Sequence, residues 1–172
     1  DSTFAAAFTG QEAIELRRML GQAAEEVERI SRHLRPGVLD ELGLVAVLHA
    51  TTMEFADRTG VAAKVSLVEL AARLPADTEL ALYRSLQEAL RNVERHARAR
   101  HVSVRLSQEG AFVRLAIKDD GIGFDSDRHT ARRDGKAILG LLSMRERAAY
   151  VGGTLTVKSG LRAGTEIEAR VP

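Results

Sequence analysis

The spacing of apolar residues changes near residue 100, and this change constrains the fold more than any other feature of the chain. Before that point apolar residues recur every three or four positions, as on one face of a helix. After it they alternate with polar residues over 102–106 and 113–117, as in half-buried strands. The chain is therefore expected to build helices first and pairs of consecutive strands later.

A heptad spacing of apolar and small residues over 9–34 predicts a coiled-coil-like helix, which Pro36 ends. An ordinary amphipathic helix packed on its own domain is the alternative. After residue 36 the chain is expected to form both helices and strands. The predicted helices cover 39–58, 77–97 and 142–151, and the predicted strands cover 61–68, 102–106, 113–117, 154–158 and 165–171.

This order of elements predicts the fold class. Runs of consecutive strands favour a mixed, mainly antiparallel sheet with helices on one face over a doubly wound parallel sheet. We therefore expect an α/β two-layer sandwich over 37–172, preceded by a helical arm over 1–36.

Composition narrows the possible functions. The 172 residues carry a net charge of +1, which gives no electrostatic case for binding nucleic acid or an anionic membrane. There is no cysteine, and no apolar run approaches the roughly 20 residues that a membrane span needs. The expected location is the cytoplasm, without membrane contact by this fragment. Because the chain starts at Asp1 and not at methionine, we expect it to be part of a longer protein that a separate segment could anchor to a membrane.

Two polar segments carry the candidate chemistry, and the first lies on the predicted helix 77–97. Glu88 and Asn92 are one turn apart and share a helix face. The amide oxygen of Asn92 is a suitable ligand for a Mg²⁺ ion whose other ligands are water and phosphate oxygens. The carboxylate of Glu88, one turn away, could order a water molecule bound to that ion. Arg95 and His96 follow in the next turn and could meet phosphate charge. A solvated helix edge is the alternative.

The second segment is Asp119-Asp-Gly-Ile-Gly-Phe124, which follows a predicted strand. Its glycines allow the backbone to approach a ligand closely, and an acid at a strand end can accept a hydrogen bond from an exocyclic amine. The positions of the acids and glycines in this segment exclude an EF-hand loop, a dinucleotide-binding fingerprint and a P-loop. A plain Asp-Gly turn remains the alternative.

A polar stretch over 125–139 contains few apolar anchors and is expected to form a mobile lid or a long loop without function. Gly140 could act as its hinge. It could also place backbone N–H groups at a helix start near phosphates.

Taken together, these segments resemble the motifs of sensor histidine kinases. Glu88-x-x-x-Asn92-x-x-Arg95-His96 is similar to the N box, and Asp119-x-Gly121-x-Gly123-Phe124 resembles the first glycine box. Residues 140–147 and 164–165 resemble the two later glycine boxes. Residues 34–44 resemble the junction between dimerisation helix and ATP-binding domain in the nitrate-sensor and desaturase-sensor type. The resemblance covers almost the whole chain.

The resemblance implies the Bergerat ATP-binding sandwich and a set of site residues. Asp119 would accept a hydrogen bond from the adenine amino group, assisted by Thr165 through water. Asn92 would hold Mg²⁺ beside Glu88, with Arg95 and His96 near the phosphates. The nucleotide-binding set is Asp119, Gly121, Gly123, Gly140, Leu141 and Thr165, and the catalytic set is Glu88, Asn92, Arg95 and His96.

The implied reaction transfers the γ-phosphoryl group of ATP to a histidine and then to an aspartate of a response regulator. The helical arm would make the full-length protein a homodimer. No histidine of this chain is followed by an acid, so the acceptor is expected upstream of Asp1, with His33 as the only rival. Ile138 and Ser143 replace glycines that are frequent in the second glycine box. An anti-sigma serine kinase, another ATPase of the same superfamily and an inactive nucleotide-binding scaffold remain alternatives.

Overall fold

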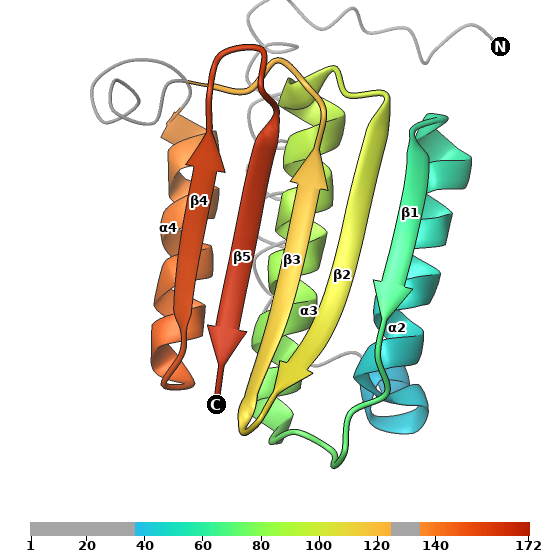
Figure 1. The fold of residues 1–172 in the computed structure, drawn as a ribbon, viewed down its shortest axis with the longest axis vertical. Coiled ribbons are helices and arrows are strands. Elements are labelled where there is room, and N and C mark those ends of the chain that lie inside the picture. Colours follow the sequence, from blue (N-terminus) through green and yellow to red (C-terminus); the bar gives the residue numbers. More distant parts are fainter. Residues whose placement is uncertain (1–36, 125–134) are drawn as a thin grey trace, which may run out of the picture. The chain divides into compact units, whose positions relative to one another are not determined.

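A five-stranded sheet forms one layer of the structure, a computed structural model that describes residues 37–124 and 135–172 (Figure 1). The strand order is β1-β2-β3-β5-β4, and β1 runs parallel to β2 while the other neighbours are antiparallel. The predicted mixed, mainly antiparallel sheet is therefore confirmed. The strands are β1 (Ala62–Leu67), β2 (His101–Glu109), β3 (Phe112–Asp119), β4 (Thr154–Ser159) and β5 (Thr165–Val171).

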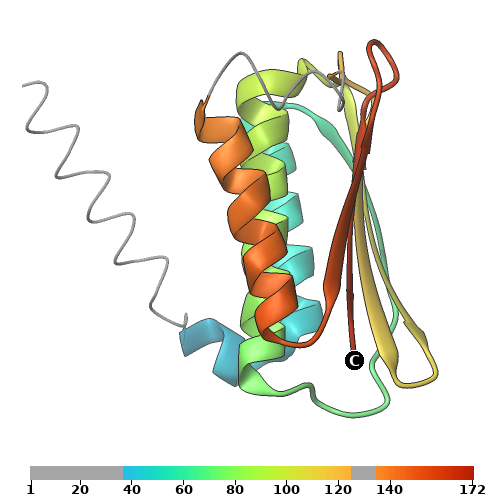
Figure 2. The same ribbon diagram turned by 90° about the vertical axis from the view of Figure 1, so that its left-hand side faces the viewer.

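Helices form the second layer and cover a single face of the sheet (Figure 2). They are α2 (Gly37–Thr59), α3 (Ala76–Asn92) and α4 (Gly135–Tyr150), and α3 continues into a π-helical turn, η1 (Val93–Ala97). The predicted helical arm over 1–36 and the first ten residues of the predicted lid, 125–134, lie outside the described residues. The predicted two-layer α/β sandwich is confirmed for the part of the chain that the structure describes.

The core lies between the two layers. Alternate residues of β2 and β3 are buried on the helical side, while their neighbours face solvent on the other side of the sheet. This alternation is the period-two pattern of the sequence. The buried side chains that form the centre of the core are Leu82, Leu86, Leu90, Val102, Val104, Leu106, Val113, Leu115 and Ile117.

Two helices differ from their predicted form. Gly43 interrupts α2 with φ 78° and ψ 169°, a backbone conformation open mainly to glycine. Helix α4 begins at Gly135, seven residues before its predicted start, so residues 135–139 are helical. Gly140 therefore lies inside the helix, and the predicted hinge at that residue is wrong. A single interior glycine costs a helix only about 1 kcal/mol, which the surrounding helix formers offset.

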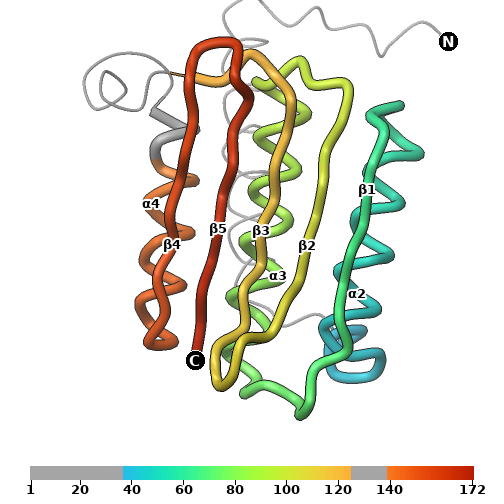
Figure 3. The backbone as a smooth tube through the Cα atoms, viewed as in Figure 1, coloured from blue at the N-terminus to red at the C-terminus, as the bar shows by residue number. Residues whose placement is uncertain are grey.

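The ends of several elements meet at the upper end of the sheet in Figure 1. The chain path in Figure 3 shows that α3 and η1 end there, β2 begins there, and β3 ends there. The turn between β4 and β5 lies at the same end. No helix in the described ranges is long and apolar enough to cross a membrane.

Candidate nucleotide-binding site

Asp119 is the last residue of β3 and carries a buried carboxylate, with 7% of the residue exposed. It lies between Val102 of β2 and Thr165 of β5 in the sheet register. Its Oδ1 accepts a hydrogen bond from the backbone N–H of Gly121 at 2.8 Å. Burial raises the pKa of this carboxyl above its ordinary value, and the N–H groups of Gly121 and Thr165 oppose that rise. A carboxyl group whose charged form is disfavoured by burial often marks a functional site.

The loop after Asp119 is held in place from two sides. The N–H of Ile122 donates to the carbonyl of Ala97 at the end of η1, over 2.8 Å. On the other side, the N–H of Arg162 in the β4–β5 turn donates to the carbonyl of Ile122, over 2.7 Å. The loop therefore joins the end of η1 to the turn between β4 and β5.

Close packing explains the two glycines of this loop. A Cβ on Gly121 would collide with the backbone and side chain of Ala97, reaching its carbonyl carbon at 2.8 Å. Gly123 has a φ of 56°, and a Cβ there would meet the carbonyl oxygen of Gly164 at 2.7 Å. The spacing of the glycines thus follows from the approach of η1 on one side and the β4–β5 turn on the other.

Ser159, at the end of β4, connects this loop to Thr165. Its Oγ accepts the N–H of Phe124 at 2.9 Å and lies 3.0 Å from the hydroxyl of Thr165. The same Oγ lies 3.0 Å from the carbonyl oxygen of Gly164, which it can donate to. Apart from its place before a glycine-containing turn, Ser159 has no sequence pattern that marks it as part of this site.

The acid and the amide predicted on the third helix lie near the end of α3. Glu88 and Asn92 are both half-buried, one turn apart, and Asn92 is the last residue of the helix. Within residues 37–124 and 135–172, neither side chain has a hydrogen-bond partner, so both remain available to a ligand. Asn92 and Asp119 lie at the same end of the sheet, connected through η1 and the contact of Ala97 with Gly121 and Ile122.

Arg95 and His96 lie on η1 and are exposed. The preceding residue, Glu94, forms a two-contact ion pair with Arg58 in the last turn of α2. This exposed pair joins η1 to α2, a contact between distant segments that no sequence pattern indicated. The π-helical turn also changes which way Arg95 and His96 project, which a regular 3.6-residue period does not predict.

Gly140 of α4 lies against Glu88 of α3 and not at a helix start. A Cβ on Gly140 would come within 3.0 Å of the Glu88 Cδ. Leu141 is half-buried and packs against the core, and its contact with a nucleotide remains a prediction.

The residues present are suitable for a nucleotide with Mg²⁺. Among the described residues no three His, Cys, Asp or Glu side chains gather as a metal site. A single amide oxygen from Asn92 agrees with a metal that takes its other ligands from phosphate and water, as Mg²⁺ usually does.

Comparison with known proteins identifies the family to which this chain belongs. The family described as histidine kinase-, DNA gyrase B-, and HSP90-like ATPase matches residues 77–172, and the chain belongs to this family. The chain is 41% identical over 153 residues to the sensor histidine kinase MctS of Rhizobium johnstonii, covering 89% of this chain and 32% of that protein. It is 35% identical over 162 residues to the signal transduction histidine-protein kinase/phosphatase DegS of Brevibacillus brevis, covering 94% of this chain and 41% of that protein.

A solved structure gives the same result. The histidine kinase domain from the blue-light activated histidine kinase of Erythrobacter litoralis shares the fold with a TM-score of 0.59 and 25% identity, over 75% of this chain and 60% of that one. The comparisons confirm the predicted ATP-binding catalytic domain of a sensor histidine kinase. The nitrate-sensor and desaturase-sensor subtype and the role of each site residue stay predictions. The chain spans about a third to two fifths of the length of the two curated relatives.

Proposed function

We propose that this chain supplies the ATP-binding half of a kinase that transfers the γ-phosphoryl group of ATP to a histidine upstream of Asp1. The observation that carries the proposal is the buried carboxylate of Asp119 at the end of β3 together with Glu88 and Asn92 on α3, whose side chains have no hydrogen-bond partner among residues 37–124 and 135–172. In this proposal one group binds the base and the other two serve the phosphates.

Asp119 would recognise adenine. Its carboxylate accepts the backbone N–H of Gly121 and retains further lone pairs, so it can also accept a hydrogen bond from an exocyclic amino group. Burial strengthens such a bond because little water competes for the carboxylate. Thr165, opposite Asp119 in the register, would assist through its hydroxyl, which Ser159 orients.

Asn92 would hold Mg²⁺ through its amide oxygen, and the ion would neutralise charge on the phosphates. Glu88, one turn earlier on the same face, would order a water of that metal or accept a proton. Arg95 and His96, exposed on η1, would lie near phosphate charge. Catalysis of phosphoryl transfer is mostly positioning and charge stabilisation, which agrees with a site of so few reactive groups.

We further propose that the full-length protein is a homodimer through its helical arm and that it passes the phosphoryl group to the aspartate of a response-regulator receiver domain. The heptad spacing over 9–34 supports the first statement, and the similarity to relatives named as histidine kinases of signal transduction supports the second. The lid over about 125–139 stays a proposal.

The test uses the full-length protein with γ-labelled ATP and Mg²⁺. We expect a protein-bound phosphate that is labile in acid and stable in base, as for phosphohistidine, and its transfer to an added receiver domain. The Asn92→Ala variant should lose the labelling, while Glu168→Ala, a carboxylate on the opposite face of the sheet, should retain it. Acid-stable labelling of a serine in a small partner protein would instead favour the anti-sigma kinase alternative.

A further inference from the structure

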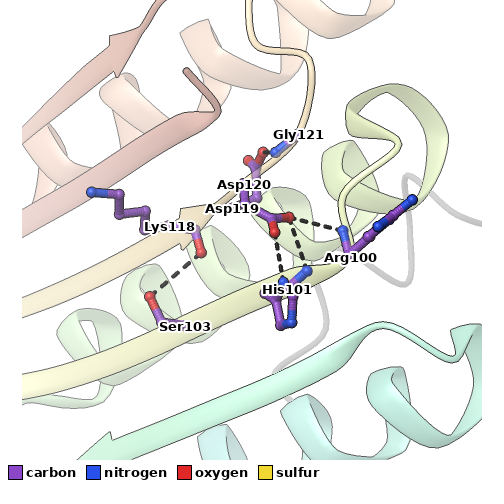
Figure 4. A network of polar contacts seen from close by, with 7 residues as sticks. All are labelled: Arg100, His101, Ser103, Lys118, Asp119, Asp120 and Gly121. Atoms are coloured by element: carbon purple, nitrogen blue, oxygen red, sulfur yellow. Dashed lines mark hydrogen bonds and ion pairs between the residues drawn. The ribbon is translucent and has the colours of Figure 1, made fainter. Parts of the chain in front are cut away.

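The side chains of Asp120 and its neighbour Asp119 point in different directions and have different hydrogen-bond partners. Successive residues at the end of a strand point to opposite faces, so Asp119 is buried on the helical side while Asp120 faces the open side of the sheet. Figure 4 shows the Asp120 side chain directed toward Arg100 and His101 at the start of β2. The proposed reaction gives this carboxylate no role.

The Asp120 carboxylate makes three contacts with two residues. Its Oδ1 accepts the backbone N–H of Arg100 at 2.8 Å and of His101 at 2.9 Å, and its Oδ2 lies 2.6 Å from Nδ1 of His101 (Figure 4). In return, the backbone N–H of Asp120 donates to the carbonyl of His101 at 3.3 Å. The backbone N–H of His101, followed by its ring, lowers the pKa of Asp120 to about 2. The carboxylate is therefore charged at any working pH.

These bonds join two parts of the site. Arg100 and His101 follow η1, after a left-handed turn at Arg98 with φ 52°. Asp120 itself stands between Asp119 and Gly121. The carboxylate therefore connects the loop after β3 to the segment that leaves η1, in addition to the bond between Ile122 and Ala97.

A surface ion pair alone would contribute little. His101 and Asp120 have side chains that are 70% and 45% exposed, and exposed pairs contribute little because water and salt screen their charges. The two backbone bonds are different, because they fix main-chain positions and do not depend on a second flexible side chain.

We propose that Asp120 is a positioning residue for nucleotide binding, which holds the loop carrying Asp119 and Gly121 against the start of β2. This inference rests on the proposed function, in which Asp119 binds adenine. The two backbone N–H contacts carry the effect, and the ring of His101 adds little.

The experiment measures the Kd of the 172-residue chain for ATP and for GTP by calorimetry with Mg²⁺, at a temperature where every variant is folded by circular dichroism. Asp120→Ala should raise the Kd for ATP about 10-fold and reduce the preference for ATP over GTP, because Asp119 loses its position. Asp120→Asn should stay within about 2-fold of the wild type, because its amide oxygen can accept both N–H groups. The matched control is Glu168→Ala, which removes an ion-paired carboxylate from the same face of the sheet and should not change the Kd.

Wild-type affinity in Asp120→Ala would overturn the proposal, and so would equal losses in Asp120→Ala and Asp120→Asn. If Asp120→Ala does not fold, Asp120→Glu replaces it, since the longer side chain moves the charge away from the two N–H groups. That variant should also weaken ATP binding, and unchanged binding would refute the positioning role. Failure of the wild type to bind ATP would instead refute the proposed function.

Discussion

Glu88 on α3 and Gly140 on α4 are in direct contact, and a Cβ on Gly140 would come within 3.0 Å of the Glu88 Cδ. Glu88 is half-buried and has no hydrogen-bond partner within the described ranges. Because glycine has no side chain, Gly140 leaves room for the Glu88 carboxylate in this position. The contact links a glycine of the second glycine box to an acid of the N box.

Gly140→Ala is expected to separate stability from activity. Alanine favours the helix interior by about 1 kcal/mol, and the group it displaces is the flexible end of Glu88, so thermal unfolding should show no loss of stability. Displacing Glu88 should lower the rate of histidine phosphorylation by about 10- to 100-fold, as expected when a catalytic group is misplaced. Initial rates of labelling with ATP measure this effect.

The matched control is Gly37→Ala at the start of α2, where a Cβ would meet nothing within 4 Å. Its labelling rate should equal that of the wild type. A Gly140→Ala protein that labels at the wild-type rate would show that the position of Glu88 does not limit the reaction.

Alanine substitutions at Gly164 and Gly110 should separate the cost of a steric clash from the cost of backbone strain. Both have positive φ, at 73° and 60°, so alanine at either position is strained by about 1–2 kcal/mol. A Cβ on Gly164 would also collide with the backbone of Asp119 and Asp120, whereas one on Gly110 meets nothing within 4 Å. Urea unfolding should show a loss of about 1–2 kcal/mol for Gly110→Ala and of more than about 3 kcal/mol for Gly164→Ala. Equal losses would mean that the turn can move away from β3.

Asp119→Asn is expected to stabilise the protein without nucleotide at neutral pH. Burial raises the pKa of Asp119, so the folded state binds this proton more tightly than the unfolded state does. The stabilising effect of that proton is present at low pH and is lost as the pH rises through the raised pKa. Asparagine is neutral at every pH, so the variant should melt at a higher temperature than the wild type at pH 7. The difference should shrink as the pH falls through the raised pKa toward the ordinary value of 3.8, because the wild-type carboxyl is then increasingly protonated.

Thermal melts of both proteins across this pH range test the sign. A wild type that is the more stable protein at pH 7 would show that the N–H groups of Gly121 and Thr165 outweigh the cost of burying the charge.

Ser159→Ala is expected to loosen the loop after β3 from the β4–β5 turn. The variant loses the acceptor for the N–H of Phe124 and the contact with the Thr165 hydroxyl, which should lower the free energy of unfolding by about 1–2 kcal/mol. Thr165→Ser keeps that hydroxyl and is the matched control, with an expected change below about 0.5 kcal/mol. Urea unfolding measures both, and similar values for the two variants would show that Ser159 does not hold the loop.

The sequence predicted the elements whose pattern is local. The alternation over 102–106 and 113–117 matches β2 and β3, and the final strand over 165–171 has the predicted bounds. Asp119 is buried and Gly121 and Gly123 make the close backbone contacts that glycine allows, while the role of this segment in binding a ligand stays a prediction.

The remaining features depend on contacts between distant segments. Helix α4 starts earlier than the pattern predicts, because residues 135–141 form a mostly apolar run with two glycines and no clear helical period, and packing against α3 supports the helix. The π-helical turn at the end of α3 is invisible to a regular helical period. The hydrogen bonds of Asp120 and Ser159 need the folded register of β2, β3 and β4, which no single segment specifies.

The affinity of the Asp119→Asn variant for ATP tests the central claim most directly. Calorimetry with Mg²⁺ should show one ATP bound per chain in the wild type. The variant should bind about 10- to 100-fold more weakly, since a charge-assisted hydrogen bond worth roughly 1.5–3 kcal/mol is lost. Equal affinities in the two proteins would contradict the assignment of Asp119 as the group that binds adenine.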